Sequence, residues 1–308
     1  MVVSRGMGPY VCPPAPSFRA PPMANLSPDR KPTDDEVDAY ALTHIGKVRK
    51  ENQDHFLLAT IHNPVRVIST SLPPSQRPPE SGERVAYVAM VADGVGSGTG
   101  GGEASATAVE AIMRFVNDSM ATYLGKPPGD LDFTAALQEA ATRSHKAILA
   151  QREKSERTGT MATTLTMYLG VWPVYYLLQV GDSRYYMYRN STLTQVTRDQ
   201  TMAQELVDSG VMSRATASKS RLAHVLSSAL GAEETMPVVT RLKSDWNNVH
   251  LFCTDGLTKH VTDERIAEIL GAMTSSQQAA ELLLKEALDA GGTDNVTIIV
   301  ARTIPSES

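Results

Sequence analysis

The chain has 308 residues, with 29 Lys and Arg against 34 Asp and Glu, which gives a formal net charge of −5 at pH 7. This acidic balance speaks against a nucleic-acid partner, because such proteins usually carry a basic stripe. No apolar stretch approaches the roughly 18 residues that span a bilayer, so no membrane partner is expected. The 42% hydrophobic and 20% charged content is ordinary for a soluble globular protein.

The chain opens with a proline-rich segment that has few apolar residues to anchor a fold. We predict that residues 1–38 form a disordered leader and that a single domain covers residues 39–304. Cys12 lies in this leader and Cys253 lies inside an apolar run, so we expect no disulfide between them. The absence of a disulfide fits a reducing compartment, and we expect a cytoplasmic location. A second proline-rich stretch, residues 69–83, predicts an exposed loop between two strands.

Past the leader, strands and helices come in blocks. Short runs rich in β-branched and aromatic residues predict strands over residues 54–60, 85–91, 163–169, 174–180, 184–188, 249–253 and 296–301. Apolar residues at helical spacing predict helices over about 109–123 and 133–148, a short one opening at Thr262, and one from a capping box at Ser275 and Gln278 to about Gly291. Short turns between neighbouring strands predict antiparallel pairs, and helices in pairs between the strand blocks predict the α+β class.

Aspartates stand at the ends of four of these apolar runs. Three runs end on an aspartate beside a glycine and the fourth opens after one, at Asp93-Gly94, Gly181-Asp182, Asp255-Gly256 and Asp294. If the last strand is antiparallel to the others, all four carboxylates meet at one end of the sheet, where they repel one another unless a cation lies among them. Oxygen-only ligands favour Mg²⁺ or Mn²⁺. The alternative for each pair is a simple turn, in which glycine takes a positive φ.

The glycine-rich stretch after Asp93 invites a nucleotide-binding interpretation. Gly94-Val95-Gly96 gives the first part of a dinucleotide fingerprint but not the rest, and no Gly-Lys-Ser/Thr ending of a phosphate-binding loop follows. We therefore favour glycines that let the backbone pass close to the acidic cluster, with the Gly94 carbonyl as a ligand.

The motifs follow one another in an order that resembles a known family. They occupy residues 43–54, 91–96, 159–164, 180–184, 254–257 and 292–297. Together they resemble the metal-dependent serine/threonine protein phosphatases of the PPM/PP2C family, most of all its bacterial members, over about residues 41–303. The resemblance implies a four-layer α-β-β-α sandwich of two antiparallel sheets flanked by helix pairs, with a two-metal centre at one edge.

The resemblance also implies a role for each candidate site residue. Asp93 matches the aspartate that bridges both metals, Gly94 matches the carbonyl ligand, and Asp255 and Asp294 match the carboxylates that complete the first metal site. Asp54 matches an acidic group that acts through water, and Asp182 matches the partner of Asp255 for a third, weaker ion in bacterial relatives. Arg49 matches the arginine that binds the substrate phosphate. The implied cofactors are Mn²⁺ or Mg²⁺. An arginine fork suits phosphate because it binds two oxygens at once.

The implied activity is hydrolysis of phosphoserine and phosphothreonine in proteins. The resemblance implies that a metal-bridging hydroxide attacks phosphorus without a phosphoenzyme. Two divalent ions would lower the pKa of a bridging water and screen the anionic substrate. The implied partners are phosphorylated proteins and a cognate Ser/Thr kinase. Two positions depart from the family pattern, Gln53 in place of a glutamate and Val95 in place of a histidine of eukaryotic members. The alternative is a weak or silent member of the fold that docks partner proteins.

Residues 197–230 resemble the flap of this family, which borders the cleft. Ala203, Leu206, Val207 and Val211 predict a helix, and the polar residues 213–220 predict a loop. Four cations of this segment could meet acidic phosphopeptides or lie in solvent, and they are Arg198, Arg214, Lys219 and Arg221.

Overall fold

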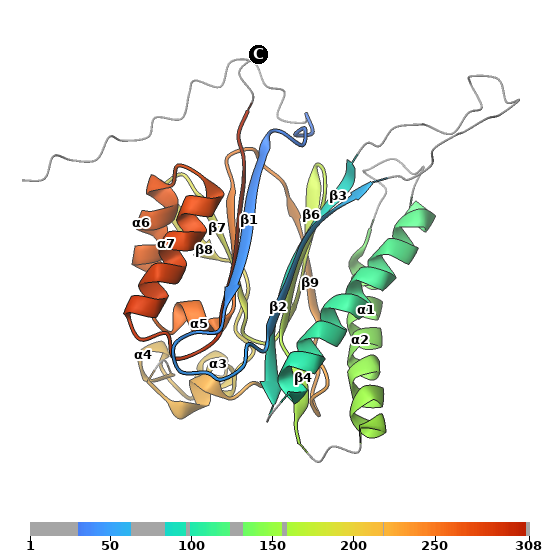
Figure 1. Cartoon of the computed structure of the whole chain (residues 1–308), viewed down its shortest axis with the longest axis vertical. Helices are drawn as coiled ribbons and strands as arrows, with labels where there is room; N and C mark the ends of the chain where they lie inside the picture. Colours follow the sequence, from blue (N-terminus) through green and yellow to red (C-terminus); the bar gives the residue numbers. More distant parts are fainter. Residues whose placement is uncertain are drawn as a thin grey trace, which may run out of the picture.

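The computed structural model describes residues 30–62, 84–96, 99–123, 132–155, 159–217 and 219–305. They form four layers, in which two sheets face each other and each is covered on its outer side by a pair of long helices (Figure 1). This confirms the predicted α-β-β-α sandwich. The predicted loop at 69–83 and most of the predicted leader, residues 1–29, lie outside the described residues.

The first sheet has five strands in the described part of the chain, in the order β1-β11-β10-β7-β8. They are β1 (Val37–His44), β11 (Val296–Thr303), β10 (Val249–Cys253), β7 (Arg184–Arg189) and β8 (Thr192–Gln195). All neighbours are antiparallel. The last strand in sequence, β11, therefore lies inside the sheet between β1 and β10.

The second sheet runs in the order β2-β3-β5-β6-β9 over the described residues, with β4 beside the end of β3. Its strands are β2 (Asp54–His62), β3 (Arg84–Gly96), β4 (Met161–Thr163), β5 (Leu165–Val171), β6 (Val174–Val180) and β9 (Val238–Lys243). The prediction that β3 stops near residue 91 was wrong. The strand continues to Gly96, because Gly94 and Gly96 pair with Thr163 and Met161 of β4.

Two helix pairs cover the outer faces. On the second sheet lie α1 (Gly100–Tyr123) and α2 (Thr134–Lys154), and on the first lie α6 (Asp263–Ala272) and α7 (Ser276–Asp289) (Figure 1). The predicted capping box holds in part, since the Ser275 side chain accepts a hydrogen bond of 3.0 Å from the Gln278 amide. None of the helices in the described ranges combines the length and hydrophobicity that crossing a bilayer requires.

Apolar side chains fill three interfaces, one under each helix pair and one between the sheets. The inter-sheet cluster is aromatic. Tyr185 and Phe252 stack with ring centroids 4.7 Å apart, and Tyr175 packs edge-on to Tyr185 at 6.2 Å. This packing fixes the two sheets against each other and so fixes the loops that leave their ends.

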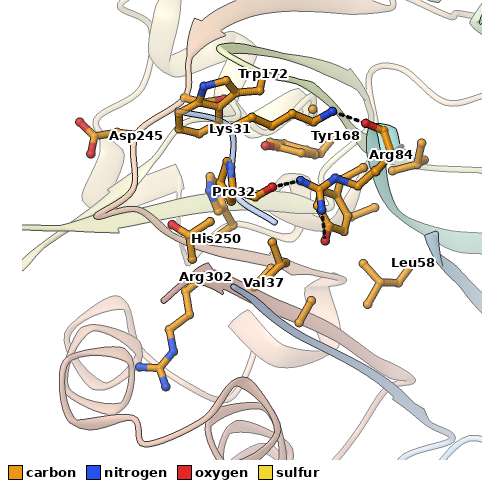
Figure 2. Close-up of a pocket in the computed structure, with 18 of the residues that line it drawn as sticks. Lys31, Pro32, Val37, Leu58, Arg84, Tyr168, Trp172, Asp245, His250 and Arg302 are labelled. Atoms are coloured by element: carbon orange, nitrogen blue, oxygen red, sulfur yellow. Dashed lines mark hydrogen bonds between the residues drawn. The ribbon is translucent and has the colours of Figure 1, made fainter. Parts of the chain in front are cut away.

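A short N-terminal strap, residues 30–36, closes one end of the sandwich. Lys31 donates to the backbone carbonyl of Arg84, and the Arg84 guanidinium donates to the carbonyl of Pro32 (Figure 2). Beneath the strap is a cavity of about 80 Å³ with aromatic walls that include Tyr168 and Trp172 (Figure 2). Residues 30–36, which the predicted leader includes, thus contact the sandwich, and β1 starts at Val37.

Candidate functional site

The predicted aspartates meet at the end of the sandwich opposite the strap. Asp54 opens β2 and is the register partner of Asp93 on β3. Asp255 follows β10, while Asp294 precedes β11, and these two strands are antiparallel as predicted. We expected the carboxylates at the end of a single sheet, but they do not all belong to one sheet. They come from the ends of both sheets, because the sandwich brings those ends together.

Asp54 connects the two sheets. Its Oδ2 accepts hydrogen bonds from Thr254 at 2.8 Å and Thr297 at 2.7 Å. Thr297 belongs to β11 of the opposite sheet, and Thr254 directly follows β10 of that sheet. The Oδ1 of Asp54 is buried and has no hydrogen-bond partner within the described residues. Burial raises the pKa of Asp54 to about 7, and repulsion from Asp255 and Asp294 acts in the same direction, against the two threonine bonds.

Asp93 lies at the centre of the cluster. Burial raises its pKa well above the usual range, and repulsion from Asp54 and Asp255 raises it further. Its backbone is held by threonines, since the Asp93 amide donates to Thr164 Oγ1 at 3.0 Å and Thr163 Oγ1 donates to the Asp93 carbonyl at 2.9 Å. These threonines thus position Asp93 through its backbone.

Asp182 follows β6 and joins the same cluster. Burial first, and then repulsion from Asp255, raises its pKa to about 7. The nearby Arg184 is engaged elsewhere, with a fork of hydrogen bonds at 2.7 to 3.2 Å on Asp199. Arg184 therefore offsets the charge of Asp182 only in part.

Two cations hold the outer carboxylates. Lys259 Nζ lies 2.6 Å from Asp255 Oδ2 and 2.7 Å from Asp294 Oδ2. Arg49 forms a fork on Asp294, with Nε at 2.6 Å from Oδ1 and a terminal nitrogen at 2.8 Å from Oδ2. Burial by itself would raise the pKa of Asp294, but the hydrogen bonds from Arg49 and Lys259 outweigh it and lower that pKa.

Glycines permit the close approach of backbone at the site. A Cβ on Gly94 would lie 2.2 Å from the Gly101 carbonyl oxygen, and one on Gly256 would lie 1.9 Å from the Asn295 carbonyl oxygen. Neither glycine has a positive φ, whereas Gly181 does, at 96°. The simple-turn alternative is therefore wrong for Gly94 and Gly256, whose role is to let chain segments touch.

A cleft of about 1090 Å³ adjoins the carboxylates. One wall carries Arg49, Asp182, Asp255, Lys259 and Asp294, and the other is formed by the flap with α3 (Met202–Asp208), α4 (Arg214–Ala217) and the 3₁₀ helix η3 (Arg221–His224). The flap thus borders the cleft, as predicted. Figure 1 shows α3 and α4 at the same end of the molecule as α5 (Asp255–Thr258).

Details of the flap differ from the sequence prediction. Val211 lies outside α3 and is 73% exposed, and α4 occupies part of the predicted loop. Of the four predicted cations, Arg198 and Arg214 line the cleft and the other two do not. Arg198 is ion-paired with Asp208 and Glu205, so its charge is largely neutralised.

The donor set fits a hard divalent ion. It consists of oxygen atoms, and the buried Oδ1 atoms of Asp54 and Asp255 lack hydrogen-bond partners in the described part of the chain. No three His, Cys, Asp or Glu side chains of the described residues are arranged to hold a metal ion directly. In this structure Lys259 and Arg49 take up oxygens of Asp255 and Asp294.

Sequence reasoning missed three residues of this site. Lys259 stands four residues after Asp255, a spacing that predicts an ion pair on a helix, but a four-residue helix such as α5 gives little periodicity to notice. Thr254 and Thr297 flank predicted aspartates closely, yet their hydrogen bonds to Asp54 arise from tertiary packing. The predicted role of the Gly94 carbonyl as a ligand stays a prediction.

Comparison with known proteins gives consistent matches. The family described as protein phosphatase 2C matches residues 80–290. The serine/threonine protein phosphatase PstP of Mycobacterium tuberculosis is 34% identical over 219 residues, which are 71% of this chain and 41% of PstP, so the chain spans less than half of that relative. The serine/threonine phosphatase stp of Listeria monocytogenes is 28% identical over 214 residues, 69% of this chain and 83% of the relative.

Solved structures extend the match to the fold. The catalytic domain of PstP in complex with two manganese ions superposes with a TM-score of 0.65 at 29% identity, covering 87% of this chain and 99% of that one.

Proposed function

The chain belongs to the protein phosphatase 2C family, and on that premise we propose that it hydrolyses phosphoserine and phosphothreonine in proteins in a metal-dependent reaction. The observation that carries the proposal is the convergence of carboxylates from both sheets at the head of a large cleft, beside an arginine. Five like charges in one half-buried place are unfavourable unless cations offset them. Divalent metal ions, with an anionic phosphoester substrate bound to them and to the arginine, match this distribution of charge.

The resident ions would be Mn²⁺ or Mg²⁺. We assign Asp93, Asp255 and Asp294 as carboxylate ligands, with Asp54 acting through water, and the carbonyl of Gly94 completes the set. Asp182 with Asp255 offers a place for a third ion. The solved PstP domain with two manganese ions supports a count of at least two. Bound ions of this kind supply an activated water and screen the charge of the phosphate.

The protein's own groups orient these parts. Thr254 and Thr297 fix one oxygen of Asp54 and leave the other without a partner among the described residues. The buried side chains near the cluster are poor nucleophiles. Ser183 is buried and shares a hydrogen bond of 2.7 Å with Thr164, while burial raises the pKa of the Cys253 thiol to about 12. Neither lines the cleft, which supports direct attack by water without a phosphoenzyme.

The substrates would be phosphorylated proteins that a cognate Ser/Thr kinase produces, in the cytoplasm, with no nucleic acid or membrane involved. The acidic net charge of the chain supports the exclusion of nucleic acid. Docking of the substrate would use the cleft between the aspartates and the flap.

Turnover of p-nitrophenyl phosphate tests the proposal. We expect hydrolysis with Mn²⁺, loss of that activity in EDTA, and its return when Mn²⁺ is added in excess. A phosphothreonine peptide should be hydrolysed under the same conditions. Absence of any metal-dependent turnover with both substrates would favour the alternative, a silent member of the fold that docks partner proteins.

Replacing Arg49 with alanine should weaken substrate binding more than it slows chemistry. The Arg49 side chain is 52% exposed at the cleft, and its guanidinium can grip two phosphate oxygens at once. We expect KM to rise by about tenfold or more with a much smaller change in kcat. Arg49→Lys is the matched control and should recover only part of the loss, because an ammonium lacks the fork. A fall in kcat with unchanged KM would contradict this role.

A further inference from the structure

Lys259 lies between two of the proposed metal ligands. Its ammonium contacts two carboxylates at once, Asp255 at 2.6 Å and Asp294 at 2.7 Å. Its side chain is 25% exposed, and those of its two partners are 19% and 13% exposed. It is therefore a half-buried, shared cation rather than a surface ion pair.

A lysine elsewhere in the chain shows the contrast. Lys285 on α7 pairs with Asp289 at the same distance of 2.6 Å and also four residues apart, but the two side chains are 70% and 59% exposed. Pairs of that exposed kind contribute little to stability. The Lys259 contacts lie in a less hydrated setting, where Coulomb attraction is stronger.

Lys259 takes up one oxygen of each of two proposed metal ligands, Asp255 and Asp294. Both contacts are made by Oδ2 atoms, and nitrogen-to-oxygen distances this short leave no space for an ion between them. The backbone of Asp255 has little freedom to move aside, because Gly256 is packed against the Asn295 carbonyl oxygen. A divalent ion that binds Asp255 and Asp294 through these oxygens must therefore push the ammonium away.

We propose that Lys259 acts as a tethered competitor for the metal site, which lowers the affinity for divalent ions and sets the metal concentration at which the site fills. The inference rests on the proposed function, because it takes Asp255 and Asp294 as metal ligands. The ammonium offsets the repulsion among the carboxylates until an ion of higher charge replaces it. Binding then costs the two ion pairs, so the apparent affinity is lower than the carboxylates alone would give.

Direct measurement of Mn²⁺ binding to EDTA-treated, dialysed protein tests the proposal. Isothermal titration calorimetry would compare wild type, Lys259→Met, Lys259→Arg and the control Lys285→Met. Methionine keeps an unbranched apolar stem only one atom shorter than lysine but carries no charge. We expect Lys259→Met to bind the first Mn²⁺ about tenfold more tightly or better, and Lys285→Met to match wild type. Lys259→Arg keeps the charge and should stay within a few-fold of wild type.

Thermal melting of the same proteins provides a second readout. In EDTA, Lys259→Met should melt at a lower temperature than wild type, because the carboxylates lose their shared counter-charge. In saturating Mn²⁺ the difference should shrink, so the Mn²⁺-induced rise in Tm is larger for Lys259→Met than for wild type. This readout also shows whether the variant is folded before titration, and if Lys259→Met does not fold, Lys259→Gln takes its place in both assays.

The outcomes separate the inference from the proposed function. If wild type binds Mn²⁺ and the neutral variant binds it equally or more weakly, the competitor role of Lys259 is overturned while the phosphatase proposal stands. If the neutral Lys259 variant binds Mn²⁺ and wild type does not, the competition is stronger than proposed, and the inference is supported. If neither binds Mn²⁺ at millimolar concentration, the metal-dependent function fails, and this inference fails with it.

Discussion

Replacing Asp255 with asparagine should reduce kcat by more than about 100-fold, because changes in the outer shell of a metal site alone cost 10- to 100-fold. Asp255 interacts with several charged groups of the site. It shares Lys259 with Asp294, and its repulsion raises the pKa values of Asp54, Asp93 and Asp182. Asparagine keeps the shape but not the charge that a divalent ion needs. Hydrolysis of p-nitrophenyl phosphate in saturating Mn²⁺ measures the loss.

The fold of the Asp255→Asn variant should stay intact. In EDTA, removing one of several like charges relieves repulsion, and this should offset the lost ion pair with Lys259, so Tm should change little. Calorimetry should show weaker Mn²⁺ binding. Near-normal turnover by a folded variant would contradict the assignment of Asp255 as a metal ligand, and a large drop in Tm would show that the residue is structural instead.

Replacing Gly256 with alanine should destabilise the protein by about 3 kcal/mol or more, the upper range for overpacking a tight site. The new Cβ would meet the Asn295 carbonyl oxygen at 1.9 Å, and this neighbour is backbone that cannot rotate away. Asn295 stands beside Asp294, so the same clash should separate Asp294 from Asp255 and weaken Mn²⁺ binding. Urea unfolding and calorimetric titration measure the two effects.

Gly102→Ala is the matched control. Gly102 lies in the first turn of α1, and a Cβ there would meet its nearest neighbours at 3.7 and 3.8 Å, which is ordinary contact. Alanine also favours helix over glycine by up to about 1 kcal/mol, so this variant should be as stable as wild type or slightly more stable. If Gly256→Ala unfolds at the same urea concentration as Gly102→Ala, the close approach of the two chain segments is not a requirement of the fold.

Local patterns were enough to predict much of the fold. The strands β6 and β10 have the bounds that their apolar runs indicated, because turn residues flank both runs. Tertiary pairing decided the rest. The β3 strand looked complete before Asp93-Gly94, and its extension to Gly96 depends on β4, which is some 65 residues away in sequence. The helix α4 begins after Ser213, whose Oγ accepts from the Thr216 amide at 3.2 Å, in a segment too polar to show periodicity.

Only part of the candidate site could likewise be predicted from local patterns. Strand-end aspartates were visible in the sequence because turn chemistry marks the ends of strands. Which sheet each strand joins was not visible, so the cluster was first placed on one sheet instead of two. The hydroxyl groups that support Asp54 come from Thr254 and Thr297, which lie 200 and 243 residues later in the chain. Such contacts depend on how the two sheets face each other, which no local pattern encodes.

The central place of β11 has a consequence for the chain during synthesis. Until residues 296–303 have left the ribosome, β1 and β10 have no strand between them, and Asp294 arrives with the same segment. Before that moment the growing chain carries the other acidic groups without a closed first sheet to hold them in place. The first sheet can therefore close, and Asp294 can join the other acidic groups, only when this strand inserts between its two neighbours.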